Sequence, residues 1–158
     1  MISEIVYGSC NYVRLNEGSK SSALISILDI RSPLTRPDFA KFKYALEMSF
    51  KDREELGTEE WPDLPTKKFN REILGDSLEK VFDLNDAHKI ITFFEMISKD
   101  DSVTKLVVHC KSGVSRSPAI AYWLARHYNV QNVHSSYEDD RLWPNGRVLR
   151  LLDKALNI

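Results

Sequence analysis

Apolar and polar residues recur along this chain with two different periods, one typical of strands and one typical of helices. Three short apolar runs, Ile2 to Val6, Ala23 to Leu28 and Lys105 to His109, have the length and composition of buried strands. Tyr44 to Phe50 alternates apolar with polar residues, which is the pattern of a half-buried strand. We therefore predict four strands at these positions.

Helical periodicity begins after the middle of the chain. Asp83 or Asn85 can cap a helix whose apolar residues recur three or four positions apart, and these residues are Leu84, Ala87, Ile90, Ile91, Phe94 and Ile97. Two more helices are predicted at 119–128 and 145–155, each with a proline in or just before its first turn.

Strand and helix signals alternate along the chain, and no internal repeat is present. A chain of 158 residues suits one domain, 1–158, which buries roughly two-thirds of its unfolded surface without a metal or disulfide. We predict a single-domain α/β fold with a central, mostly parallel sheet flanked by helices. The polar segment 57–75, interrupted by prolines, is predicted to be a long surface loop or lid.

Composition excludes several classes of protein. With 42% apolar residues, 28% charged residues and a net charge of -1, the chain has no global bias toward nucleic acid or anionic lipid, so any anion site must be local. No apolar stretch reaches the ~20 residues of a membrane helix, and the first residues lack a secretory pattern. We expect a cytoplasmic monomer with no nucleic-acid or membrane partner. Its two cysteines, Cys10 and Cys110, are not expected to form a disulfide.

One segment, between an apolar strand and a helix, combines residues that suit phosphate chemistry. It reads His109-Cys110-Lys111-Ser112-Gly113-Val114-Ser115-Arg116-Ser117-Pro118. Gly113 is free to take a positive φ, so the loop can turn its N–H groups inward as an anion nest beside a helix N-terminus. The same field favours the thiolate form of Cys110. Arg116 adds a planar guanidinium that can hold two phosphate oxygens at once.

This loop resembles the signature loop of the cysteine-based protein tyrosine phosphatase superfamily. The matching positions are His109, Cys110, Gly113, Arg116 and Ser117. Over a hundred residues of α/β pattern precede the cysteine, whereas in the low-molecular-weight branch it lies near the N-terminus. The resemblance therefore favours the compact dual-specificity-like branch of small prokaryotic and viral type.

A second stretch supports the same branch. Pro144 to Leu152 is similar to the Pro-Asn-x-x-Phe-Leu-x-Gln-Leu segment that closes such domains, and it departs from that pattern at Val148 and Leu151. Together the two matches extend the resemblance over roughly residues 23 to 152.

The resemblance implies a role for each residue of the loop. Cys110 attacks the phosphorus and forms a cysteinyl-phosphate intermediate. Arg116 and the loop N–H groups bind the phosphate oxygens, and the residues implied to do so are Lys111, Ser112, Gly113, Val114, Ser115 and Arg116. The Ser117 hydroxyl bonds the cysteine sulfur and helps it leave, and a helix N-cap is a second role that does not exclude the first. His109 is expected to stay inside and bond the loop, and no metal or cofactor is implied.

The general acid is implied to be an aspartate on a loop after an upstream strand. Asp52 is our first choice, because it follows the predicted strand that ends at Phe50, and related small prokaryotic phosphatases often carry Phe-Asp-Asp there. Asp63 is the second choice, since Trp61-Pro62-Asp63 resembles the acid loop of the larger, receptor-like tyrosine phosphatases.

The expected substrate is a phosphorylated protein or peptide. Phosphotyrosine is implied first, and a shallow pocket would also admit phosphoserine and phosphothreonine. Lys111 is the only cation of the loop besides Arg116, which is little positive charge for a polyphosphate head group. The alternative is a phosphate-binding pseudophosphatase that lacks a working acid.

Overall fold

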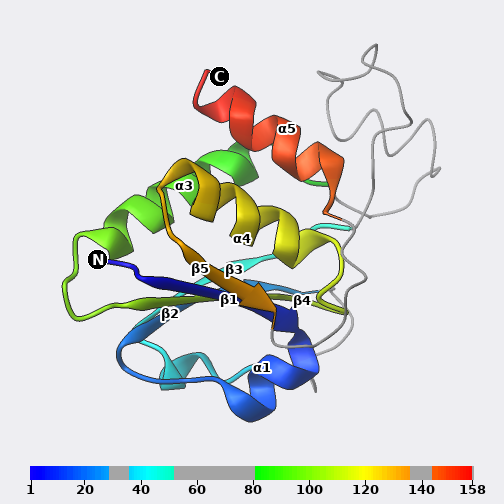
Figure 1. Cartoon of the computed structure of the whole chain (residues 1–158). Helices are drawn as coiled ribbons and strands as arrows, with labels where there is room; N and C mark the ends of the chain where they lie inside the picture. The colour runs from blue at the N-terminus through cyan, green and yellow to red at the C-terminus, as the bar shows by residue number, and fades with distance from the viewer. Residues whose placement is uncertain (29–35, 52–80, 136–143, 158) are drawn as a thin grey trace.

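A computed structural model of the chain describes residues 1–28, 36–51, 81–135 and 144–157, in which five strands and four α-helices are found (Figure 1). The strands are β1 (Glu4–Ser9), β2 (Ser22–Ile27), β3 (Tyr44–Met48), β4 (Lys105–Cys110) and β5 (Asn132–Ser135). The helices are α1 (Cys10–Asn16), α3 (Leu84–Ser98), α4 (Arg116–His127) and α5 (Gly146–Ala155), and a short 3-10 helix, η2 (Phe39–Lys41), precedes β3.

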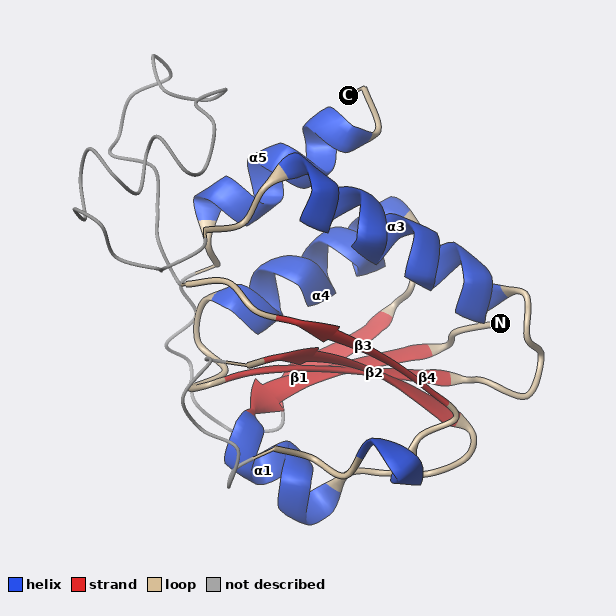
Figure 2. Ribbon diagram, turned by 180° about the vertical axis from the view of Figure 1, so that it is seen from behind, coloured by secondary structure: helices blue, strands red, loops and turns tan. Residues whose placement is uncertain are grey.

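The strands form one parallel sheet in the order β3-β2-β4-β1-β5, which confirms the predicted α/β fold with a central parallel sheet. From the neighbouring strands β1 and β4 the chain leaves on opposite faces. After β1 it enters α1 on one face, and after β4 it enters α4 on the other (Figure 2). Ligand sites of open parallel sheets lie where connections diverge in this way. The carboxyl ends of β1 and β4 are therefore the expected place for a site.

Apolar side chains cover both faces of the sheet. The larger core lies between the sheet and α3, α4 and α5, and its strand residues include Ile5, Tyr7, Ile25, Ile27, Leu106, Val108 and Cys110. The smaller core packs α1 against the other face, through Val13, Leu24, Phe42 and Val107. Successive strand side chains point to opposite faces, so Cys110 faces the α4 side and His109 faces the α1 side.

Most predicted elements are present, with shifts at their ends. α3 buries the predicted apolar stripe except Leu84, which is exposed at the start of the helix. The helix begins with a capping box, in which Asp83 and Asp86 each accept a hydrogen bond from the other's N–H. α4 begins at Arg116 rather than at Ala119, and α5 begins at Gly146 with Asn145 as its N-cap. The segment 57–75, predicted as a loop or lid, lies outside the described residues.

Three elements were not predicted: α1, the short 3-10 helix η2 and β5. α1 has seven residues and buries only Cys10 and Val13, which is too short for a helical period to appear in the sequence. β5 has four residues and no fully buried side chain. Its strand conformation follows from its pairing with β1, which a local pattern does not encode.

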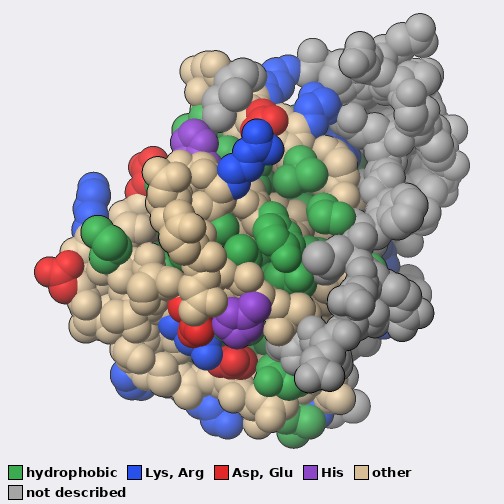
Figure 3. All heavy atoms as spheres, in the orientation of Figure 1, with side chains coloured by type: hydrophobic (Ala, Val, Ile, Leu, Met, Phe, Trp, Pro, Cys, Tyr) green, Lys and Arg blue, Asp and Glu red, His purple; other side chains and the backbone are tan. Residues whose placement is uncertain are grey.

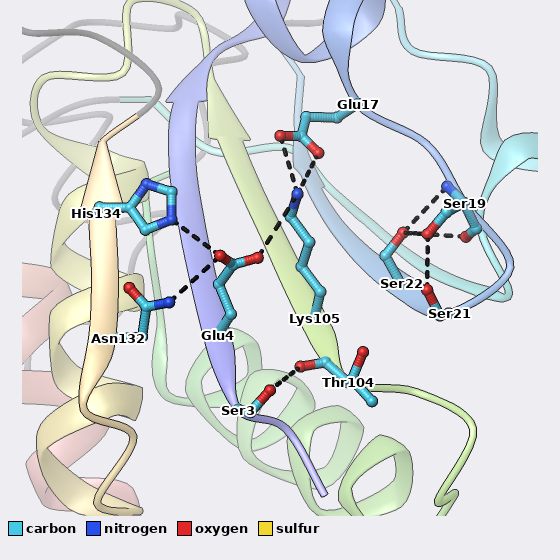
Figure 4. Close-up of polar contacts among 10 residues, drawn as sticks. All are labelled: Ser3, Glu4, Glu17, Ser19, Ser21, Ser22, Thr104, Lys105, Asn132 and His134. Atoms are coloured by element: carbon cyan, nitrogen blue, oxygen red, sulfur yellow. Dashed lines mark hydrogen bonds and ion pairs between the residues drawn. The ribbon is translucent and has the colours of Figure 1, made fainter.

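A polar strip crosses the sheet near the amino ends of β1 and β4 (Figure 4). The ammonium of Lys105 lies 2.8 Å from a carboxylate oxygen of Glu17 and 3.7 Å from one of Glu4. The other oxygen of Glu4 accepts from Asn132 and lies 3.2 Å from His134 on β5. These contacts tie β5 and the end of α1 to the first residues of β1 and β4.

Charged side chains of both signs lie interspersed on the face drawn in Figure 3. This distribution agrees with a net charge near zero. Among the described residues, no helix combines the length and the apolar character needed to cross a membrane.

Candidate active site

The loop between β4 and α4 lies at the edge of the sheet where the connections diverge. β4 ends at Cys110, residues 111–115 form a tight bend, and α4 begins at Arg116. Cys110 pairs in register with Ser9, the last residue of β1. The cysteine thus stands where the carboxyl ends of the two strands meet the start of α4, and Figure 1 shows how these elements are arranged.

The sulfur of Cys110 is surrounded by hydrogen-bond donors. The residue is only 1% exposed. The backbone N–H of Gly113 donates to Sγ at 3.2 Å, and the N–H of Ser117, in the first turn of α4, donates at 3.4 Å. The Ser117 hydroxyl lies 3.2 Å from the same sulfur and 3.4 Å from the carbonyl oxygen of Gly8. Such donors, at the start of a helix, are placed to stabilise negative charge that develops on the sulfur during a reaction.

Gly113 is required at the bend of the loop. Its φ is +80°, and a Cβ placed there would lie 2.6 Å from the carbonyl carbon of Gly8 and 2.7 Å from the nitrogen of Ser9. These are backbone atoms at the end of β1, which cannot move aside as a flexible side chain would. A glycine therefore allows the loop to pack on β1 with its N–H pointing at Cys110.

Gly113→Ala is expected to lower the free energy of unfolding by about 2 kcal/mol or more, because the substitution adds both backbone strain and a steric clash. Chemical denaturation measures the change. Gly146→Ala is the matched control, since nothing lies within 4 Å of a Cβ at that first position of α5. The control should be neutral or slightly stabilising, and equal losses in the two variants would contradict the structural role of Gly113.

Arg116 is the first residue of α4, and it is only 5% exposed. Its Nη1 donates to the carbonyl oxygen of Phe50 at 2.8 Å. The next residue, Lys51, forms a parallel bridge with Val81. The guanidinium is thus anchored to the chain that continues from β3, at the same edge of the sheet as Cys110.

The start of α5 is bonded to the loop as well. The N–H of Asn145 donates to the carbonyl oxygen of Ser115 at 3.1 Å, and its side chain caps α5 by accepting from the N–H of Val148. Asn145 is buried. The Pro144–Asn145 stretch noted in the sequence therefore supports the cysteine loop directly.

His109 lies inside the protein, on the face of the sheet opposite to the Cys110 side chain. Its Nδ1 has the carbonyl oxygen of Cys110 as a partner, so Nδ1 carries the proton and donates. Nε2 then accepts from the hydroxyl of Ser26 on β2, in register with His109. Burial and, to a smaller extent, the positive charge of Arg116 lower the pKa of His109 to about 4, against the opposing effect of the hydrogen bond to the Cys110 carbonyl. The imidazole is therefore neutral at physiological pH.

This pKa predicts a loss of stability in mild acid. The imidazole titrates near 6.5 in the unfolded chain and near 4 in the folded protein, so the unfolded state binds more protons between these values. The contribution of His109 to the free energy of unfolding is therefore fully present above pH 6.5 and is lost as the pH falls toward 4. The loss amounts to up to about 3 kcal/mol. The free energy of unfolding, measured at several pH values, should fall less steeply in His109→Gln than in the parent. His127→Gln, at an exposed position of α4, should keep the parent slope, and a His109→Gln slope equal to the parent's would contradict the assignment.

The implied phosphate-binding residues occupy one continuous bend. Lys111 and Ser112 are exposed, Val114 is half-buried, and Gly113 and Ser115 are buried. Ser115, not Ser117, is the N-cap of α4. The capping role considered for Ser117 is therefore wrong, and its hydroxyl is placed against the sulfur instead.

Several other residues of the site carry no clear signal in the sequence. The structure adds the backbone of Gly8 and Ser9 and the carbonyl of Phe50 to it. In the sequence, only the pair Gly8-Ser9, at the end of an apolar strand, could have indicated that β1 contributes to the site. Asp52 and Asp63, the candidate acids, lie outside the described residues.

Within the described part of the chain, no group of three or more His, Cys, Asp or Glu side chains is arranged to hold a metal ion. Neither a scan against protein-family models nor a search of curated proteins finds a match for this chain.

Proposed function

We propose that the protein is a phosphomonoester hydrolase that acts on phosphotyrosine in proteins or peptides through a cysteinyl-phosphate intermediate. The observation that carries the proposal is the pair of N–H donors around the Cys110 sulfur, together with the Ser117 hydroxyl 3.2 Å from the same sulfur. A buried structural cysteine has no need of such donors. A nucleophile that must be a thiolate, and must later leave as one, requires them.

In the first step the Cys110 thiolate attacks phosphorus in line with the ester oxygen. The S–P bond forms, the P–O bond to the tyrosine breaks, and Asp52 gives its proton to the leaving phenolate. In the second step Asp52, now a carboxylate, takes a proton from water as the water oxygen attacks phosphorus. The S–P bond breaks, phosphate leaves, and the Ser117 hydroxyl donates a hydrogen bond to the departing thiolate.

Arg116 stabilises the equatorial oxygens of the phosphoryl group in both steps. Its position beside Ser117, in the first turn of α4, supports this role, because the same turn places an N–H against the sulfur. The guanidinium offers two parallel donors. The backbone N–H groups of residues 111–116 supply the remaining donors in this proposal.

The test of the proposal is hydrolysis of an aryl phosphate over a range of pH, in the parent and in Asp52→Ala. Removing the acid that protonates the leaving group should lower kcat by roughly a hundredfold or more and flatten the basic limb of the profile. Asp63→Ala is the matched control, because it removes the second candidate carboxylate of the same type. It should retain the parent profile.

Three other results would change the assignment of the acid, of the activity or of the specificity. Loss of the basic limb in Asp63→Ala alone would assign the acid to Asp63 and contradict the choice of Asp52. A parent protein that binds inorganic phosphate but does not hydrolyse aryl phosphate would contradict the proposed activity and support a pseudophosphatase. Parallel assays with phosphotyrosine, phosphoserine and phosphothreonine peptides separate a tyrosine-specific enzyme from a dual-specificity one.

A further inference from the structure

A second arginine, Arg147, is buried near the site, although the mechanism proposed above does not use it. It is the second residue of α5 and only 3% exposed. Its Nε donates to the carbonyl oxygen of Phe82 at 2.7 Å. A short hydrogen bond from a buried cation to a backbone carbonyl fixes the chain at that carbonyl, because breaking it would leave both groups desolvated and unpaired.

Phe82 connects this arginine to the chain that follows β3. The rings of Phe82 and Phe50 meet edge to face, with centroids 4.9 Å apart and an interplanar angle of 63°. Both side chains are buried in the main core. The residues beside them in the chain, Lys51 and Val81, form a parallel bridge. The two segments at Phe50 and Phe82 therefore pack as one unit.

The Phe50 carbonyl is the acceptor for Arg116. Its oxygen receives Nη1 of Arg116 at 2.8 Å. The four residues thus form a continuous series of contacts from α5 to the first residue of α4, through the Nε of Arg147, the Phe82 carbonyl, the two rings and the Phe50 carbonyl. Each contact is direct, and all four residues are buried.

We propose that Arg147 is a positioning residue, which sets the orientation of the Arg116 guanidinium by fixing Phe82 and, through it, the Phe50 carbonyl. The inference rests on the proposed function, in which Arg116 holds phosphate. Bidentate binding of an oxyanion depends on the plane of the guanidinium, and Nη1 is fixed by the Phe50 carbonyl. A shift of that carbonyl would rotate the guanidinium and weaken both oxygen contacts.

Two substitutions separate the hydrogen bond from the rest of the arginine side chain. Arg147→Gln keeps an N–H donor at the ε position of the side chain, whereas Arg147→Met places a methyl group there. Both variants lose the guanidinium charge, so a difference between them reports the bond to the Phe82 carbonyl.

The first measurement needs no ligand. It follows the Nε–H signal of Arg116 by nuclear magnetic resonance, assigned by its disappearance in Arg116→Lys. The signal should shift or broaden in Arg147→Met and stay close to the parent position in Arg147→Gln. An unchanged signal in the folded Met variant would overturn the proposal, whatever the activity of the protein.

The second measurement is the inhibition constant of inorganic phosphate against aryl phosphate hydrolysis. Arg147→Met should raise it roughly threefold to tenfold, and Arg147→Gln should restore most of the parent value. In an Arg116→Lys background the Met substitution should have little further effect, because the two residues act in series. Additive effects would show that Arg147 acts on phosphate binding independently of Arg116 and would overturn the proposal.

Failure of the proposed function and failure of the proposed role of Arg147 give different results. A parent that neither binds phosphate nor turns over aryl phosphate contradicts the proposed function, while the Arg116 signal still decides whether Arg147 positions the guanidinium. If Arg147→Met does not fold, Phe82→Leu interrupts the same series at the ring contact with Phe50. Phe82→Leu should shift the Arg116 signal, and an unchanged signal there would equally overturn the proposal.

Discussion

Cys110→Ser should abolish aryl phosphate hydrolysis and leave the fold intact. Serine is nearly isosteric with cysteine, and its hydroxyl can accept from the N–H groups of Gly113 and Ser117 that bond the sulfur in the parent. The substitution therefore removes the nucleophile and little else. An alcohol at this position is a far weaker nucleophile than a thiolate, so kcat should fall by at least about a thousandfold.

Steady-state assay and thermal denaturation of the same samples measure this effect. Cys10→Ser is the matched control, because Cys10 is a buried cysteine at the start of α1 that has no role in the proposed chemistry. It should retain parent kcat. A Cys110→Ser protein with parent activity would exclude the sulfur as nucleophile.

Arg116→Lys is expected to have the second largest effect. Lysine keeps the positive charge but loses the planar pair of donors and the anchor to the Phe50 carbonyl. Loss of donors that act in the transition state should lower kcat/KM by roughly a hundredfold to a thousandfold.

The split between kcat and KM makes the second prediction specific to Arg116. A residue that follows the phosphoryl group through the transition state lowers kcat when it is replaced, whereas a residue that serves only ground-state binding raises KM alone. Arg126→Lys changes an exposed arginine of the same helix and is the control. Unaltered kcat in Arg116→Lys would contradict the assigned role.

The sequence predicts the cysteine loop itself better than it predicts the residues that pack around the loop. The bend from Cys110 to Arg116 is local, so a glycine, a short apolar strand and a helix start within ten residues are enough to predict it. The contacts that fix the bend are made by residues far away in the sequence. Gly8 contacts the loop from β1, and Asn145 bonds it from the start of α5.

The same distinction applies to the elements of the fold. α3 carries its period and its cap in its own residues, which makes it predictable from Asp83 onward. α4 was predicted to begin at Ala119 because its apolar residues begin there. Its first turn holds Arg116 and Ser117, whose burial comes from the site and not from an apolar pattern. Polar residues that are buried for chemical reasons shift a boundary predicted from hydrophobicity.

The most direct test of the proposed chemistry is to trap the phosphoryl group on the enzyme. The parent is mixed with an aryl phosphate, quenched in acid during turnover, digested and analysed by mass spectrometry. We expect one phosphoryl group on the peptide that contains Cys110, and none on that peptide in Cys110→Ser. Turnover with the phosphoryl group on another side chain, or with no phosphorylated intermediate under any quench condition, would contradict the proposed chemistry.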